Sequence, residues 1–316
     1  MIRYLPDRIV ERSGGPFYRL SSRLIPRFPK TSFKFGSIRL TLTAPFGLAS
    51  GWADTPRKVY DVLSLGAGLV FTKTVTFHPK YGNPYPRMVR GPGNNWLINS
   101  MGLPNAGLAC WLQWLRHHGR LPENAFFSIK GENPREWRVL IKALMGYTSL
   151  IELNFSCPNV EHGIMDTAEA VRVLRGIQVS FPDTPLSLKI SPEYSNSQVI
   201  DLLRRLMAGK STIKAVTLFN TKPIHNSKLG NPLKTGGLSG PILFHRLQSG
   251  LEAVRKHFSA SDLIVFGVGG ITTGEQARYV WDRYRAIPLT LTGFLTQGPY
   301  IFHKWSQGFR PDNLRI

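Results

Sequence analysis

The chain has few cysteines and no long apolar run. Its 316 residues include only 2 cysteines, Cys110 and Cys157, which excludes a disulfide framework, a Cys-rich zinc site and a four-thiolate iron–sulfur site. No run approaches the ~18 apolar residues of a spanning helix, and the first residues lack the apolar stretch of a secretory signal. The 8 histidines show no paired ligand spacing, so we predict no metal site. These absences favour a reducing, cytoplasmic interior.

Acidic residues are also scarce. The chain carries 40 Lys and Arg against 19 Asp and Glu, a formal net charge of +21. Such an excess favours nucleic acid, an anionic membrane face or acidic small molecules as partners, and a solvated basic surface is the alternative. The basic residues are spread along the chain without an RNA- or DNA-binding motif, so we expect no specific nucleic-acid partner.

Beyond residue 40 the sequence alternates short apolar runs with helical patterns. The runs are typical of strands covered on both faces, at 46–50, 68–73, 126–131, 150–156, 186–191, 215–220, 263–269 and 289–293. Amphipathic spacing predicts helices at 55–65, 108–118, 134–145, 166–179, 197–207, 241–257 and 274–284. Eight strands alternating with helices predict an α/β fold, a closed (β/α)8 TIM barrel over residues 41–316.

Residues 1–40 depart from this pattern and are predicted to be a basic N-terminal extension. Through residue 35 they hold eight basic residues against two acids. Phe17, Leu20, Leu24 and Ile25 alternate with arginines as in a basic amphipathic helix that lies on an anionic membrane. A basic strap packed over the bottom of the barrel is the alternative.

Glycines follow the last two predicted strands, at Gly269, Gly270 and Gly293. In this fold the chemistry lies at the C-terminal strand ends, and phosphate commonly binds after strands seven and eight. Tight turns that need positive φ are the alternative explanation. The chain has neither a Walker lysine motif nor a GxGxxG that opens a βαβ unit. We therefore expect a phosphate-bearing cofactor other than a nucleoside triphosphate or a Rossmann-bound NAD.

Lysines and asparagines collect at the same strand ends. Lys73 and Lys189 close strands two and five, and burying a lysine is costly unless an anion or an electron-rich ring meets it. Two such lysines suit an anionic cofactor such as a reduced flavin, whereas extension to solvent at the rim is the alternative. Amides supply donors and acceptors without charge, which suits a planar ring or a carboxylate. The amides in question are Asn99, Asn154, Asn159 and Asn220.

Cys157 stands between two of these asparagines, just past strand four. A thiolate acts as a base or nucleophile when a polar site favours its charged form. A buried structural cysteine is the alternative. Only His162 is near it in sequence, which disfavours a protease-like dyad. We interpret Cys157 as a candidate base.

Six motifs, in family order over roughly residues 38–305, resemble those of the dihydroorotate dehydrogenases, in particular the FMN-dependent branch with a cysteine base. They are NFSCPN at 154–159, INSMGLPN at 98–105, GNPYPR at 82–87, PFGLASG at 45–51, TGGLSGP at 235–241 and GVGGI at 267–271. The resemblance implies an FMN-bearing barrel that oxidises (S)-dihydroorotate to orotate in de novo pyrimidine biosynthesis. Cys157 would remove the C5 proton while the C6 hydride passes to the flavin.

The same resemblance implies a set of binding residues. Substrate would be held by Asn99, Met101, Gly102, Leu103, Asn159, Asn220 and Thr221. FMN would be held by Ala49, Ser50, Lys73, Thr74, Asn154, Lys189, Gly240, Gly269, Gly270, Thr292 and Gly293.

The branch of the family stays open. Cys157, Lys73 and the 235–241 loop resemble the soluble branch, and 159–163 resembles the enzymes that work with an iron–sulfur flavoprotein partner. The basic extension and 291–294 resemble the membrane-associated quinone users, although Asp54 stands where these have a lysine. Quinone, fumarate and a partner's NAD all remain candidate acceptors. We expect a homodimer in the cytoplasm, with a peripheral place at the inner face of a membrane as the alternative.

Two other functions compete with this one. The motifs at 46–50 and 72–74 also resemble dihydropyrimidine dehydrogenases, although the 98–105 loop favours dihydroorotate. The other alternative is a flavin-bound protein whose basic surface binds nucleic acid or an anionic membrane, which predicts binding that weakens steeply with salt.

Overall fold

The computed structural model describes residues 31–35, 38–155 and 167–309. Its centre is a barrel of eight parallel strands, closed because β4 pairs with both β3 and β8. This confirms the predicted (β/α)8 barrel. Around the barrel the strands are β3 (Gly47–Ala53), β4 (Leu69–Thr72), β8 (Ala125–Lys130), β9 (Ile151–Asn154), β10 (Leu186–Ile190), β11 (Ile213–Leu218), β14 (Ile264–Gly267) and β15 (Ile287–Thr290). The short strand β5 (Val75–Thr76) extends the sheet beside β8.

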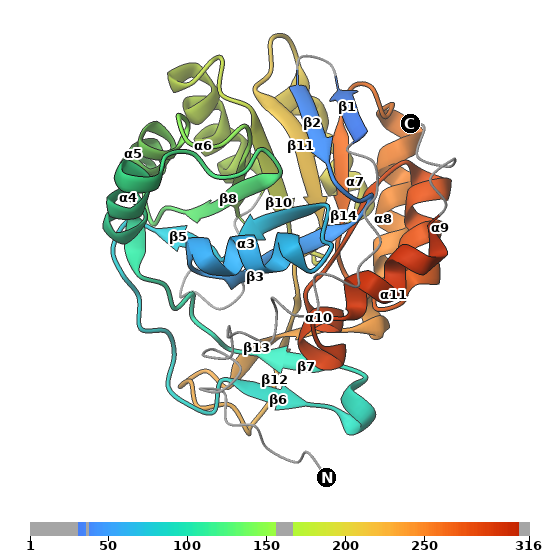
Figure 1. Ribbon diagram of the computed structural model, residues 1–316. Helices are drawn as coiled ribbons and strands as arrows, with labels where there is room; N and C mark the ends of the chain where they lie inside the picture. The colour runs from blue at the N-terminus through green and yellow to red at the C-terminus, as the bar shows by residue number, and fades with distance from the viewer. Residues whose placement is uncertain (1–30, 36–37, 156–166, 310–316) are drawn as a thin grey trace.

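Helices cover the outside of the barrel (Figure 1). They are α3 (Pro56–Ser64), α4 (Gly107–His118), α5 (Pro134–Leu144), α6 (Thr167–Ser180), α7 (Asn196–Met207), α8 (Phe244–His257), α9 (Gly274–Tyr284), α10 (Thr292–Gln297) and α11 (Ile301–Gly308). Local sequence fixes several of their starts, because Ser195 with Gln198 and Thr273 with Gln276 form capping boxes. None of the helices in the described part of the chain is long and apolar enough to cross a membrane.

Several predicted elements differ in extent from the observed ones, and two of the differences bear on the site. The eighth strand ends at Thr290 rather than at 293, because the backbone turns into α10 and the Gly293 N–H donates to Thr290 Oγ1 at 3.2 Å. The predicted helix at 241–257 begins as the 3-10 turn η3 (Pro241–Leu243), and α8 follows it. Both corrections lie at the mouth of the barrel, where the backbone bends around the site.

A four-stranded antiparallel sheet, absent from the sequence prediction, lies beyond the C-terminal strand ends (Figure 1). Its order is β12 (Lys222–His225), β13 (Thr235–Ser239), β7 (Leu97–Asn99) and β6 (Met88–Arg90), with the 3-10 turn η2 (Pro92–Asn94) between β6 and β7. It joins two insertions, one after β5 and one after β11. The sheet supplies a second wall to the barrel mouth.

A hairpin of β1 (Thr31–Phe35) and β2 (Ile38–Leu42) lies at the other end of the barrel (Figure 1). Leu40 and Leu42 in β2 are fully buried, so this end of the predicted extension packs against the core. The predicted amphipathic segment, 17–25, lies outside the described residues.

The barrel interior is apolar at one level and polar at the next. The Phe71 ring lies 5.1 Å from that of Phe266 and 5.3 Å from that of Phe126, between ring centroids. Since β4 and β14 are not neighbours, the Phe71–Phe266 contact crosses the interior. Towards the C-terminal ends, the inward positions become Ser128, Glu152 and Ser187, all buried. This polar layer is the floor of the site.

Candidate active site

A cavity opens where the barrel strands end, between them and the antiparallel sheet. The cavity and the open space at its mouth together span about 1460 Å³. The structure brings most of the predicted site residues to its walls. They are Ala49, Ser50, Lys73, Thr74, Asn99, Met101, Leu103, Asn154, Lys189, Asn220, Thr221, Gly269, Gly270 and Thr292.

The other predicted residues lie beside the cavity or beyond the described chain. Gly102 has φ +68°, and a Cβ there would lie 2.8 Å from the Asn83 backbone nitrogen. The Gly240 carbonyl lies 2.9 Å from where a Cβ of Gly270 would be, so these two glycines let their loops approach each other. Gly293 opens α10. Cys157 and Asn159 lie outside the described residues.

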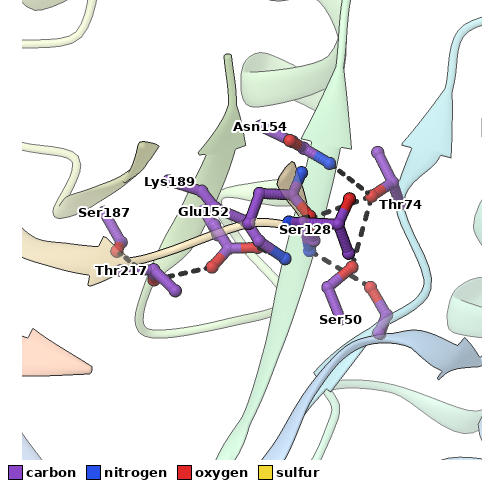
Figure 2. Close-up of polar contacts among 11 residues, drawn as sticks. Ser50, Thr74, Ser128, Glu152, Asn154, Ser187, Lys189 and Thr217 are labelled. Carbon is purple, nitrogen blue, oxygen red and sulfur yellow. Dashed lines mark hydrogen bonds and ion pairs between the residues drawn. The ribbon is translucent and has the colours of Figure 1, made fainter. Parts of the chain in front are cut away.

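Hydroxyls and an amide meet at Thr74 on the cavity floor (Figure 2). Thr74 Oγ1 lies 3.2 Å from Ser50 Oγ and 3.3 Å from Ser128 Oγ, and Asn154 Nδ2 donates to it at 3.0 Å. Ser50 and Ser128 lie within β3 and β8, Thr74 follows β4, and Asn154 ends β9. Side chains far apart in sequence are thereby held in one buried network, which fixes the rotamers of the cavity wall.

Lys189 faces the cavity with a carboxylate behind it. Its side chain is 5% exposed, so it does not extend to solvent at the rim. Its Nζ lies 4.0 Å from Oε1 of Glu152, whose side chain is 1% exposed, and Thr217 Oγ1 donates to Glu152 Oε2 at 2.7 Å. Buried charges in proteins are normally paired, and this pair fits that rule. No sequence motif marks Glu152 as a site residue.

A second charged group, which the motif analysis did not assemble, lies at the mouth. Asp54 Oδ1 lies 2.7 Å from Lys58 Nζ, and its Oδ2 lies 4.0 Å from Lys73 Nζ. The Lys58 ammonium also lies 5.1 Å from the centroid of the Trp52 ring, and all four residues line the cavity. Lys58 stands four residues after Asp54, at the start of α3. That i, i+4 spacing was the one sequence signal that could have found this pair.

Arg246 holds one wall of the cavity from outside. Its guanidinium lies 4.1 Å from the centroid of the Phe219 ring, which lines the cavity. It also donates to Pro192 O at 3.0 Å, Tyr194 O at 2.6 Å and Asn196 Oδ1 at 2.8 Å. Burial of the guanidinium lowers the pKa of Arg246 below its ordinary value. The side chain thus clamps the loop after β10 to the residue that follows β11.

No group of three or more His, Cys, Asp or Glu side chains suited to a metal ion occurs in the described part of the chain. The polar lining instead contains three lysines, Lys58, Lys73 and Lys189, and the amides of Asn99, Asn154 and Asn220. Fold and cavity together define a (β/α)8-barrel protein with its site at the C-terminal face, lined for an anionic, planar ligand.

Comparison with known proteins identifies the family. Residues 34–310 match the sequence profile of dihydroorotate dehydrogenase, so the chain belongs to the dihydroorotate dehydrogenase family. A dihydroorotate dehydrogenase (quinone) of Burkholderia cenocepacia is 31% identical over 301 residues, which are 89% of this chain and 84% of the relative. A dihydroorotate dehydrogenase (quinone) of Paraburkholderia xenovorans is 27% identical over 310 residues, which are 92% of this chain and 89% of the relative.

The fold has a close counterpart among solved structures. Dihydroorotate dehydrogenase of Eimeria tenella, crystallised in complex with ferulenol, matches with a TM-score of 0.77 at 19% identity, over 96% of this chain and 91% of that one. The ligand-free form of the same enzyme from Eimeria tenella matches with a TM-score of 0.76 at 20% identity. This match covers 96% of this chain and 94% of that one. These matches and the closed barrel confirm the predicted fold, and the family match confirms the predicted family.

Enzymes of this family are oxidoreductases that use FMN, and the residues present fit that cofactor. Lys73 and Lys189 suit the electron-rich edge of a flavin ring. Gly269 and Gly270 have φ values of +132° and +89°, and the nearest atoms to a Cβ on Gly269 would be 3.8 Å away. Both glycines line the cavity, so no side chain of their own separates a phosphate from their backbone N–H groups.

Proposed function

We propose that this protein oxidises (S)-dihydroorotate to orotate with FMN bound at the barrel mouth. The observation that carries the proposal is the convergence of the family motifs on one cavity. Most of the residues that the resemblance assigns to FMN or to the pyrimidine line the same space, although they come from separate strands and two insertions. Bound FMN would supply the two-electron acceptor for the hydride from C6 of dihydroorotate.

The substrate lies between the barrel and the antiparallel sheet in this proposal. Asn99 stands on β7 and donates from Nδ2 to Gly237 O at 3.3 Å, which orients the amide. Asn220 and Thr221 face it from the loop after β11, and the Thr221 N–H donates to Asn220 Oδ1 at 2.9 Å. With the Met101–Leu103 backbone, these groups bind the ring amides and the carboxylate of the pyrimidine.

Cys157 is proposed as the base that takes the C5 proton. It follows β9 by three residues, and Asn154, the last residue of that strand, lines the cavity. The proton passes to sulfur as the hydride leaves C6, so the C5–C6 single bond becomes the double bond of orotate. The protein holds the two leaving hydrogens between a base and an acceptor, and this orientation is its main contribution to the rate.

Quinone is proposed as the oxidant that regenerates the flavin. Support comes from the relatives, which are named as quinone-type enzymes. The basic segment before residue 31 would then place the protein at the cytoplasmic face of an anionic membrane, where quinone is dissolved. A cysteine base combined with a quinone acceptor would unite features of two branches of the family.

The test of the base replaces Cys157 and uses the chain's other cysteine as the matched control. We expect Cys157→Ala to bind FMN and orotate normally while losing about 10²-fold or more of turnover, the usual contribution of a general base. Cys110→Ala, on an exposed site of α4, should retain full turnover. Turnover of Cys157→Ala near that of Cys110→Ala would exclude the base assignment.

A further inference from the structure

Glu152 is a buried carboxylate that the proposed chemistry does not use. It lies on β9, two residues before Asn154, and points into the barrel without lining the cavity. Its Oε2 accepts from Thr217 Oγ1, which itself lies 3.5 Å from Ser187 Oγ. Its Oε1 has no hydrogen-bond partner within the described chain, and the nearest cation to it is Lys189 Nζ at 4.0 Å.

Strand register explains why the two charges face each other. Across β9 and β10, Glu152 pairs with Ser187 and Asn154 pairs with Lys189. Inward positions alternate along each strand, so Glu152 lies one layer below Lys189 and Asn154. The carboxylate therefore lies deeper in the barrel than the ammonium.

From this arrangement we propose that Glu152 is a positioning residue for Lys189, and that it limits the positive charge that Lys189 presents to the flavin. A carboxylate 1% exposed is costly to bury without a function that requires it. The hydrogen bond from Thr217 fixes the carboxylate, and the carboxylate in turn holds the flexible lysine stem on the cavity wall. The inference rests on the proposed binding of FMN in this cavity.

The consequence is a lowered reduction potential of bound FMN. A cation at the cavity wall favours the reduced flavin, which carries more negative charge than the oxidised form. The carboxylate holds the ammonium back towards the barrel interior, which weakens the field that this cation exerts at the cavity. Glu152 thereby keeps the flavin potential below the value that Lys189 alone would set, which favours passing electrons on to the acceptor.

The first measurement is the midpoint potential of FMN bound to Glu152→Gln, a variant that keeps the side-chain size and the acceptor for Thr217. We expect reduced FMN to gain about tenfold in affinity relative to oxidised FMN, a rise of about 30 mV for this two-electron couple. Glu123→Gln, an exposed carboxylate before β8, is the matched control and should leave the potential unchanged. An unchanged or lower potential in Glu152→Gln would overturn the proposal.

A second pair of variants tests whether Glu152 acts through Lys189. In a Lys189→Met background, adding Glu152→Gln should shift the potential by less than half of its effect in the wild type. An equal shift would mean that the carboxylate acts on the flavin directly.

Thermal unfolding gives a readout independent of flavin chemistry. Lys189→Met leaves a buried carboxylate without its cation, so the double variant with Glu152→Gln should unfold at a higher temperature than Lys189→Met alone. The opposite order would contradict the pairing even if FMN binding is established. Failure of the purified protein to bind FMN would instead refute the proposed function and leave the unfolding order as a separate result.

Discussion

Asn154 donates a hydrogen bond to Thr74 across the barrel floor, from Nδ2 to Oγ1 at 3.0 Å. The two residues belong to motifs 80 positions apart in the chain, and both line the cavity. The hydroxyl of Thr74 is also within hydrogen-bond distance of Ser50 and Ser128. One hydroxyl thus connects side chains from β3, β8 and β9 with the residues that follow β4.

Replacing Thr74 by valine removes that hydroxyl and keeps the shape of the side chain. We expect Thr74→Val to lower the free energy of unfolding by about 1–3 kcal/mol, because it leaves buried partners unsatisfied, and to weaken FMN binding. Thr212→Val is the matched control, since the Thr212 hydroxyl is buried and has no hydrogen-bond partner among the described residues, so its loss should be neutral or stabilising. Urea unfolding measures the stability of both variants, and FMN titration measures their affinity for the cofactor. Equal effects of the two substitutions would contradict the network.

Asp54 is expected to weaken anion binding at the cavity mouth. Its carboxylate neutralises part of the charge of Lys58 and Lys73, so Asp54→Asn should tighten orotate binding by about two- to fivefold, an effect that fades with salt. Asp201→Asn removes the carboxylate of an exposed i, i+4 pair with Arg205 on α7 and should leave orotate binding unchanged. Calorimetric titration at low and high salt measures both. Weaker binding by Asp54→Asn would show that the carboxylate organises the lysines instead.

Gly270 is expected to tolerate no side chain. Its φ is +89°, and a Cβ would lie 2.6 Å from the Phe244 backbone nitrogen. Gly270→Ala should therefore cost about 1–3 kcal/mol of stability and reduce FMN affinity, because the backbone must move away from the cofactor. Gly176→Ala, at an exposed position of α6 where no atom of the described residues lies within 4 Å of the new Cβ, should gain about 0.5–1 kcal/mol. A Gly270→Ala variant with wild-type stability and affinity would refute this role.

The segment before residue 31 provides a test of the acceptor. We expect removal of residues 1–30 to spare β1 and the barrel, so reduction of a soluble dye by dihydroorotate should continue. Reduction of a long-chain quinone in anionic vesicles should fall, because seven basic residues are lost with the segment. Neutral vesicles serve as the control. Unchanged quinone activity in anionic vesicles would assign the segment a packing role.

The barrel could be predicted because its strands are buried on both faces. Runs such as Ile264–Gly267 are apolar throughout, and helices with apolar residues three and four apart follow them. The antiparallel sheet could not be predicted, because its strands are short and β13 contains two glycines. Those glycines reflect tertiary contact, since a Cβ on Gly237 would lie 1.9 Å from Thr221 Oγ1.

The site was predictable where a single residue marks a strand end. Lys73 and Lys189 could be recognised because a lysine at the end of an apolar strand is costly to bury unless an anion or a polar ligand meets it. Glu152 did not, because its partners Thr217 and Lys189 are brought to it only by the register of three strands. Trp52 and Lys58 were missed for a similar reason, since their place at the mouth depends on how α3 leaves β3.

The most direct test of the account is an anaerobic absorbance spectrum of the purified protein, reconstituted with FMN, before and after dihydroorotate is added. The account predicts flavin bands that bleach on addition of dihydroorotate and that do not bleach with dihydrouracil. A protein that binds no FMN, or bound flavin that keeps its bands in the presence of dihydroorotate, would contradict it.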